Sequence, residues 1–189
     1  SDRLPWITFA GSGDVAAGRE RLGVSMMDWA PGGARDGTGQ PITPTRYVDL
    51  PFARPPAERP GYRELYAVVN DTTLPPADAD EPLPPPPPAN LDHLTDDIER
   101  LGFDWVLAVA SLLLGAPVMI TMAEPPSTEE RVRCLDAIAA LLPYGFRADL
   151  VAGTWTPNTA NHGLRLAFSG WANDSQYGVP LRVMPPDNG

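Results

Sequence analysis

One polar stretch carries side chains whose types and spacing could hold a ligand. Residues 154–162 read Thr-Trp-Thr-Pro-Asn-Thr-Ala-Asn-His and include Thr156, Asn158, Asn161 and His162. Hydroxyl, amide and imidazole groups donate and accept hydrogen bonds, so this set could bind a small ligand or a protein partner. The same residue types are also typical of a hairpin loop whose asparagines stabilise turns. The sequence leaves both interpretations open.

An enzyme built on this loop would need further groups, and Asp149 or Cys134 could join His162 there. The chain has two histidines and one cysteine, none at the i, i+4 or C-x-x-C spacing of a zinc site. All 14 basic residues are arginine, which excludes lysine Schiff bases and phosphate-loop lysines. The G-x-S-x-G motif of serine hydrolases is absent. We therefore predict no catalytic residue, metal or cofactor, and the question of enzyme activity stays open.

A glycine-rich segment has the loose spacing of a dinucleotide-binding turn. Residues 9–16 read Phe-Ala-Gly-Ser-Gly-Asp-Val-Ala and fit G-x-G-x-x-A after a β-prone run. That motif needs a following helix whose first amides bind the pyrophosphate. Residues 17–23 allow barely one helical turn before the next glycine, so a simple glycine turn is the better interpretation.

Composition and charge narrow the classes of partner. The 189 residues include 24 acidic and 14 basic side chains, for a net charge of −10. Such a surface repels nucleic-acid phosphates and anionic membranes. A single cysteine allows no intramolecular disulfide, so we expect a cytoplasmic protein. Both chain ends look like cuts, which suggests a domain of a larger, multidomain polypeptide.

The polar loop needs a scaffold, and the strongest structural pattern is a βαβ unit at residues 117–156. Its strand, helix and strand are expected at 117–123, 127–142 and 148–156. The helix opens with Ser127-Thr-Glu-Glu130, the pattern of a capping box. Such a unit is parallel and right-handed, and we expect its two strands side by side. The 154–162 loop would then leave the carboxyl end of the second strand, where open α/β sheets bind ligands.

The remaining segments predict a single mixed α/β domain. Strands are expected at 5–10, 22–30, 45–52, 164–168 and 179–184, with the first three forming an antiparallel meander, and a short amphipathic helix is expected at 62–69. Residues 71–89 contain five consecutive prolines and predict an internal linker that includes a stiff polyproline II spacer.

Residues 91–112 carry apolar side chains at alternating steps of three and four, which predicts a long helix with Asn90 as its N-cap. Gly102 could kink or break it. From 103 to 114 nearly every position is apolar, so we expect this part to be buried on most of its circumference. A membrane span is not predicted, because Gly115 and Pro117 end the apolar run too early.

Two further segments carry a family resemblance. Residues 141–155 with 164–169, and residues 45–52 with 62–66, resemble segments of the GTPase-associated adaptor proteins of bacterial conflict and signalling operons. The likeness covers about half of the chain and rests on structural residues. It implies an adaptor or sensor region beside effector modules, without an established reaction.

These observations favour a non-enzymatic interaction or sensor domain of a larger bacterial signalling or defence protein. Its partner would be another protein or a neighbouring domain of the same polypeptide. The alternative is an enzyme or small-ligand-binding domain that uses the loop at residues 154–162. The sequence does not define the oligomeric state.

Overall fold

The computed structural model describes residues 4–12, 21–51, 59–71, 85–122, 124, 126–156, 163–172 and 176–181. They form a mixed α/β fold. Its strands are β1 (Trp6–Ser12), β2 (Arg21–Met27), β3 (Thr45–Pro51), β4 (Val118–Thr121), β5 (Val151–Gly153), β6 (Leu166–Ser169) and β7 (Tyr177–Pro180). Its helices are α1 (Tyr62–Asp71), α2 (Leu91–Leu101), α3 (Phe103–Gly115), α4 (Thr128–Ala140) and α5 (Tyr144–Ala148), with a short 3-10 helix, η2, at Pro31–Gly33.

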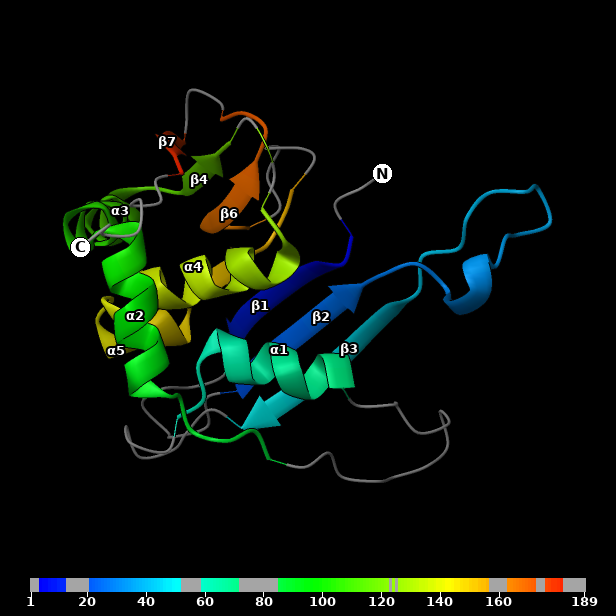
Figure 1. Ribbon diagram of the computed structural model, residues 1–189, viewed down its shortest axis with the longest axis horizontal. Helices are drawn as coiled ribbons and strands as arrows, with labels where there is room; N and C mark the ends of the chain where they lie inside the picture. Colours follow the sequence, from blue (N-terminus) through cyan, green and yellow to red (C-terminus); the bar gives the residue numbers. More distant parts are fainter. Residues whose placement is uncertain are drawn as a thin grey trace, which may run out of the picture.

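All seven strands belong to one sheet, in the order β3-β2-β1-β5-β6-β4-β7. The first three pair antiparallel, which confirms the predicted N-terminal meander (Figure 1). Their register aligns Phe9 with Val24 and Val24 with Val48, so the meander presents one continuous buried row. The last four strands in that order run parallel to one another, and β5 joins the two halves by pairing antiparallel with β1.

The predicted strand–helix–strand unit is present, but its two strands are not neighbours. β4 and β5 point the same way, and α4 connects them, yet β6 lies between them in the sheet. Every residue of β6 is buried, and the strand has a neighbour on each side in the sheet. The expectation that the two strands lie side by side was therefore wrong, because β6, which comes later in the chain, pairs with both of them and lies between them.

The helices pack on one face of the sheet. Figure 1 shows α1, α2 and α4 on the viewer's side of the strands, with α2 crossing in front of one end of α4. α1 contacts β2, α3 contacts β4, and α4 contacts both α1 and α2. Phe9 of β1 stacks on Tyr62 of α1 with ring centroids 4.3 Å apart. This burial of the meander's apolar row against α1 fixes the helix layer on the sheet.

The glycine-rich segment after β1 has a packing role at Gly11. This residue is still within the strand, and its amide donates to the Leu150 carbonyl at 3.3 Å. A Cβ on Gly11 would lie 1.6 Å from the Ala148 carbonyl oxygen, so only glycine fits there. The close approach of α5 explains this glycine without a bound dinucleotide, while residues 13–20 lie outside the described part of the chain.

The start of α4 was predicted correctly, whereas the bounds of the strand that follows it were not. The Ser127 amide donates to Glu130 Oε2 at 2.8 Å and the Glu130 amide to Ser127 Oγ at 3.2 Å, which confirms the capping box. The predicted strand at 148–156 is shorter, because α5 occupies its first residue and β5 begins only at Val151.

The described end of the predicted proline spacer is packed against the domain. Pro86 is buried, and the Ala89 amide donates to the Arg59 carbonyl at 2.9 Å. Residues 72–84, which make up most of the predicted linker, lie outside the described residues. Among the helices that the structure does describe, none is both long and apolar enough to cross a membrane.

Candidate interaction surface

The predicted ligand loop is only partly described. Thr156 is buried, at 2% exposure, and its amide donates to the Phe168 carbonyl at 2.9 Å. It follows β5 at the carboxyl end of the parallel strands, which is where the loop was expected to begin. Asn158, Asn161 and His162 lie outside the described residues. The described start of the loop is therefore bound into the fold.

The polar groups next to Thr156 serve the fold as well. Thr154 is fully buried, and its hydroxyl oxygen accepts from the Ile7 amide at 2.9 Å. Its carbonyl accepts from Arg131 Nη1 at 2.9 Å, while Arg131 Nη2 donates to Thr128 Oγ1 at 2.8 Å. This buried cluster ties the first turns of α4 to β1 and to the end of β5.

The proposed helpers of an enzymatic site, Asp149 and Cys134, both lie in described parts of the chain. Asp149 is exposed and precedes β5, whereas Thr156 follows it, so the two lie at opposite ends of the strand. Cys134 is buried in α4, and burial raises the pKa of its thiol, which keeps it neutral and unreactive. Among the described residues, no group of three or more His, Cys, Asp and Glu could hold a metal ion.

A different part of the chain presents a surface suited to contact: helix α2 and helix α3, which follow one another. The Asn90 side chain accepts from the Asp92 and His93 amides at 3.1 and 3.2 Å, which confirms it as the N-cap of α2. α2 ends at Gly102, whose φ of 85° favours glycine and separates the two helices. The expected break at this glycine is thus confirmed, and the chain turns sharply there (Figure 1).

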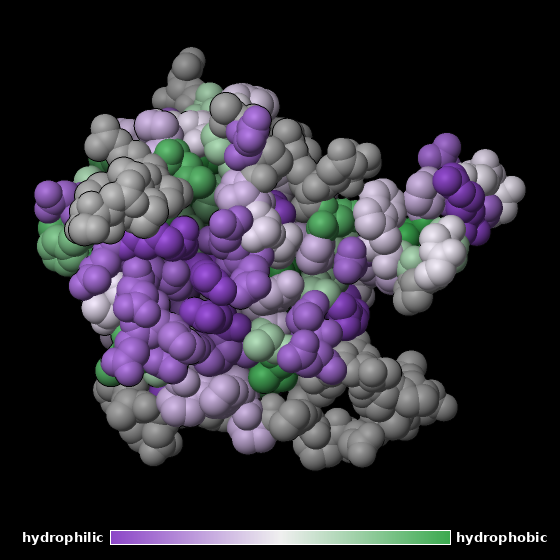
Figure 2. All heavy atoms as spheres, viewed as in Figure 1, coloured by the Kyte–Doolittle hydropathy of each residue, from purple (hydrophilic) through white to green (hydrophobic). Residues whose placement is uncertain are grey.

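The outward side of α2 is acidic. Asp92, Asp96 and Glu99 are exposed, and their spacing of four and three residues places them on one face of the helix. In the described part of the chain none of the three forms an ion pair. We call these residues the acidic stripe. Figure 2 shows hydrophilic residues over α2 and hydrophobic residues at the adjoining margin, where α3 lies.

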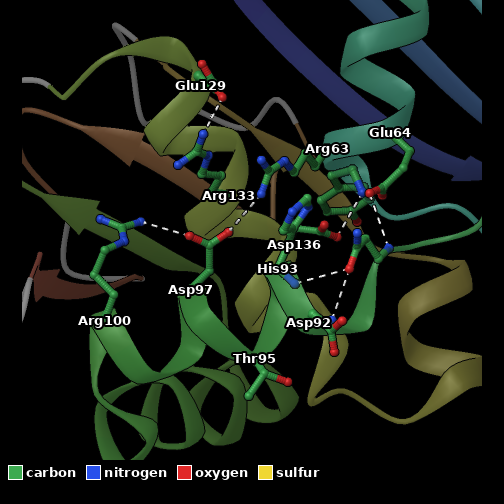
Figure 3. Close-up of polar contacts among 12 residues, drawn as sticks. Arg63, Glu64, Asp92, His93, Thr95, Asp97, Arg100, Glu129, Arg133 and Asp136 are labelled. Carbon is green, nitrogen blue, oxygen red and sulfur yellow. Dashed lines mark hydrogen bonds and ion pairs between the residues drawn. The ribbon is translucent and has the colours of Figure 1, made fainter.

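The inward side of α2 is neutralised by arginine. Asp97 is buried, and its carboxylate forms ion pairs with two arginines. Asp97 Oδ2 lies 3.7 Å from Arg63 Nη1, and Asp97 Oδ1 lies 3.3 Å from Arg100 Nη2. Figure 3 shows Asp97 between these two guanidinium groups, whereas Asp92 points away from them. The acids that face the fold are therefore compensated, and the acids that face outward are not.

A second carboxylate is buried behind α2 in the middle of α4. Asp136 accepts from the Tyr62 amide at 2.8 Å and so caps the first turn of α1 from a neighbouring helix (Figure 3). Desolvation raises the pKa of Asp136 to about 6, against the opposing effect of the Tyr62 hydrogen bond. This group is a structural cap with no open side toward solvent, since it is 7% exposed.

Helix α3 leaves an apolar face uncovered. Its inward face is formed by Val106, Val109, Ala110 and Leu113, which are buried. Phe103, Leu107 and Leu114 are 54%, 44% and 53% exposed, and their spacing of four and seven residues aligns them along one side. We call these three residues the apolar stripe. The expectation that α3 is buried on most of its circumference was therefore wrong.

The position of α3 explains this exposure. The helix lies toward the β7 edge of the sheet, where the Trp105 indole donates to the Pro180 carbonyl at 3.1 Å and Arg165 Nη2 donates to the Leu113 carbonyl at 2.7 Å. A peripheral helix in a layered fold can turn only one side to the core. The apolar residues at 103–114 are more numerous than one buried helix face needs. This excess could have indicated an exposed apolar face, but it was interpreted as burial.

Comparisons of this chain with protein-family models, with curated proteins and with solved structures gave no match. The surface formed by α2 and α3 therefore has to be interpreted from its own geometry and charge.

Proposed function

We propose that this chain is a non-enzymatic interaction domain, an adaptor that binds a protein partner through α2 and α3. The observation that carries the proposal is the uncovered apolar stripe, Phe103, Leu107 and Leu114. Exposed apolar side chains that line up on one side of an element mark a contact surface, because water contact with them is unfavourable and a partner removes it.

The inward anchoring of α3 supports this proposal. The indole of Trp105 and the guanidinium of Arg165 hold α3 to the sheet. The inward side chains of α3, Val109 and Leu113, are fully buried. The outward residues therefore need not be released from the core to make a contact. A preorganised surface of this kind binds without a large ordering cost.

The chemistry of the described residues favours an adaptor over an enzyme. Thr154 and Arg131 are engaged within the fold, and the Cys134 thiol is buried and neutral. The resemblance of residues 141–155 to GTPase-associated adaptor regions points to the same class, a module of a larger bacterial signalling or defence protein.

Site-specific photo-crosslinking in the native host tests this function. A photoreactive amino acid in place of Leu107 should give a discrete adduct with a specific protein or with a neighbouring domain. The same group in place of Tyr47, which is 64% exposed on β3, is the matched control and should not give that adduct. Adding Leu114→Asp should abolish the Leu107 adduct, since a buried charge opposes apolar contact.

Two results would overturn the proposal. One is the absence of any adduct from position 107. The other is the same set of adducts from positions 107 and 47, which would indicate random collision instead of a specific contact. Thermal unfolding of each variant would check that the exposed substitutions leave the fold intact.

A further inference from the structure

We infer that the partner of this surface is a basic amphipathic helix of another protein. The inference rests on the proposed function, because it names what the apolar stripe binds. Two independent observations carry it. One is the linear arrangement of the apolar stripe along α3. The other is the acidic stripe on α2, which forms no ion pair among the described residues and ends near the corner at Gly102.

The form of the apolar stripe suits a helical partner. Phe103, Leu107 and Leu114 span twelve residues of one helix, and the eleven steps between the first and the last cover about 17 Å at 1.5 Å per residue. A second helix with apolar residues at matching steps of four and seven can lay its own row along this one, as helices do when they pack. An extended strand would instead need an unpaired sheet edge, which this helical surface does not supply.

The charge of the surface selects among helices. Helices α2 and α3 together carry five carboxylates and one arginine, and that arginine, Arg100, is directed to Asp97. The acidic stripe ends at Glu99, three residues before the corner at Gly102, and the exposed Asp104 directly follows Phe103, so acidic residues adjoin the first end of the apolar stripe. Arginine or lysine on the flanks of the partner would complement them, which favours fast and selective association.

The same charges argue against other occupants. A second copy of this chain docked through the same surface would bring two acidic stripes together, and like charges oppose such a contact. An anionic lipid surface would be repelled for the same reason. A basic amphipathic helix of another protein could cover the apolar stripe with its apolar face and place its basic residues near the acidic stripe.

Synthetic peptides provide the probe. The test peptide has about 20 residues, leucine on one helical face and arginine on its flanks, as in known helix-in-groove ligands. A second peptide replaces arginine by glutamate, and a third scrambles the first so that its amphipathic period is lost. Binding to the whole chain is measured by fluorescence anisotropy at low and moderate salt, and the first peptide should bind at least about tenfold more tightly than the others, with salt weakening it.

Variants of the chain separate the two parts of the surface. Leu107→Asp should abolish binding of the basic peptide. The double variant Asp96→Asn with Glu99→Gln should weaken it roughly fivefold and reduce its salt dependence, as expected for the loss of two exposed ion pairs. The double variant Glu124→Gln with Asp149→Asn changes net charge equally at exposed positions outside both stripes, and should bind like the wild type.

The outcomes distinguish this inference from the proposed function. Equal binding of arginine and glutamate peptides, both lost with Leu107→Asp, would overturn the basic partner and keep the apolar contact. If no peptide binds while the Leu107 crosslink forms, the helical basic partner is wrong and the interaction domain stands. Unchanged binding to Leu107→Asp would contradict both. Sedimentation or vesicle flotation that depends on Leu107 would instead identify a second copy or a lipid surface, and would overturn the inference.

Discussion

Helices α3 and α4 have the same length of 13 residues and opposite relations between composition and burial. α3 contains a single charged residue, Asp104, yet only four of its residues are buried. α4 contains five charged residues, and eight of its residues are buried, among them Arg131 and Asp136. The more polar of the two helices is the one that lies in the interior.

The difference shows that the position of a helix in the fold decides which of its residues are buried. Hydrogen bonds offset the cost of burying charged side chains there. α4 contacts both α1 and α2, and two of its charged side chains, Arg131 and Asp136, are enclosed and bind backbone groups of other parts of the chain. α3 lies toward the β7 edge, and its outward apolar residues Phe103, Leu107 and Leu114 are 44–54% exposed. In α4 the buried polar side chains find hydrogen-bond partners inside the fold, while in α3 apolar side chains remain exposed to solvent.

Replacing Arg131 tests whether the polar groups of α4 are structural. Arg131→Met should lower the free energy of unfolding by about 4 kcal/mol, because the Thr154 carbonyl and the Thr128 hydroxyl lose charge-assisted donors. Arg133→Met is the matched control on the same helix, since Arg133 is partly exposed and pairs with Glu129 one turn earlier. It should cost less than about 1 kcal/mol. Equal losses in urea unfolding would contradict a special role for Arg131.

The two sides of α3 should respond differently to the same truncation. Leu113→Ala removes a fully buried side chain and should lower the free energy of unfolding by about 3 kcal/mol. Leu107→Ala removes a side chain that is 44% exposed and should cost less than about 1 kcal/mol. Urea unfolding of both variants measures the contrast. A large loss for Leu107→Ala would show that the apolar stripe stabilises this chain itself and is not reserved for a partner.

The sequence predicted the features that depend on neighbouring residues. The capping box at Ser127 and Glu130, the N-cap at Asn90 and the break at Gly102 each involve groups within a few residues of one another, so their residue types suffice. The closeness of the first three predicted strands in the sequence likewise predicted the antiparallel meander.

The features that were missed depend on contacts between distant segments. Nothing within residues 117–156 reveals that β6, which begins at Leu166, takes the place between β4 and β5. Apolar content in α3 could mean burial or an exposed contact face, and only the peripheral location of the helix decides between them. Of the predicted ligand residues, Thr156 follows β5 and is buried, whereas Asn158, Asn161 and His162 are outside the described residues.

The buried carboxylate of α4 sharpens the comparison through its pH dependence. Burial raises the pKa of Asp136 from 3.8 to about 6, so the folded state binds this proton more tightly than the unfolded state. The free energy of unfolding should therefore rise as the pH falls from 7 to 5, by about 1 kcal/mol, and fall again as the pH returns. Urea unfolding at several pH values in this window measures the slope.

Asp136→Asn is the control, because an amide oxygen can still accept from the Tyr62 amide but the residue no longer titrates. The difference between wild type and variant isolates Asp136 from the other carboxylates. Glu130 has a lowered pKa, from hydrogen bonds to Ser127, and its stabilisation is lost only as the pH falls further. Parallel curves for the two proteins between pH 7 and 5 would show that Asp136 is not held in a desolvated site. The polar interior of α4 would then resemble the solvated outward side of α2, and the contrast with α3 would rest on Arg131 alone.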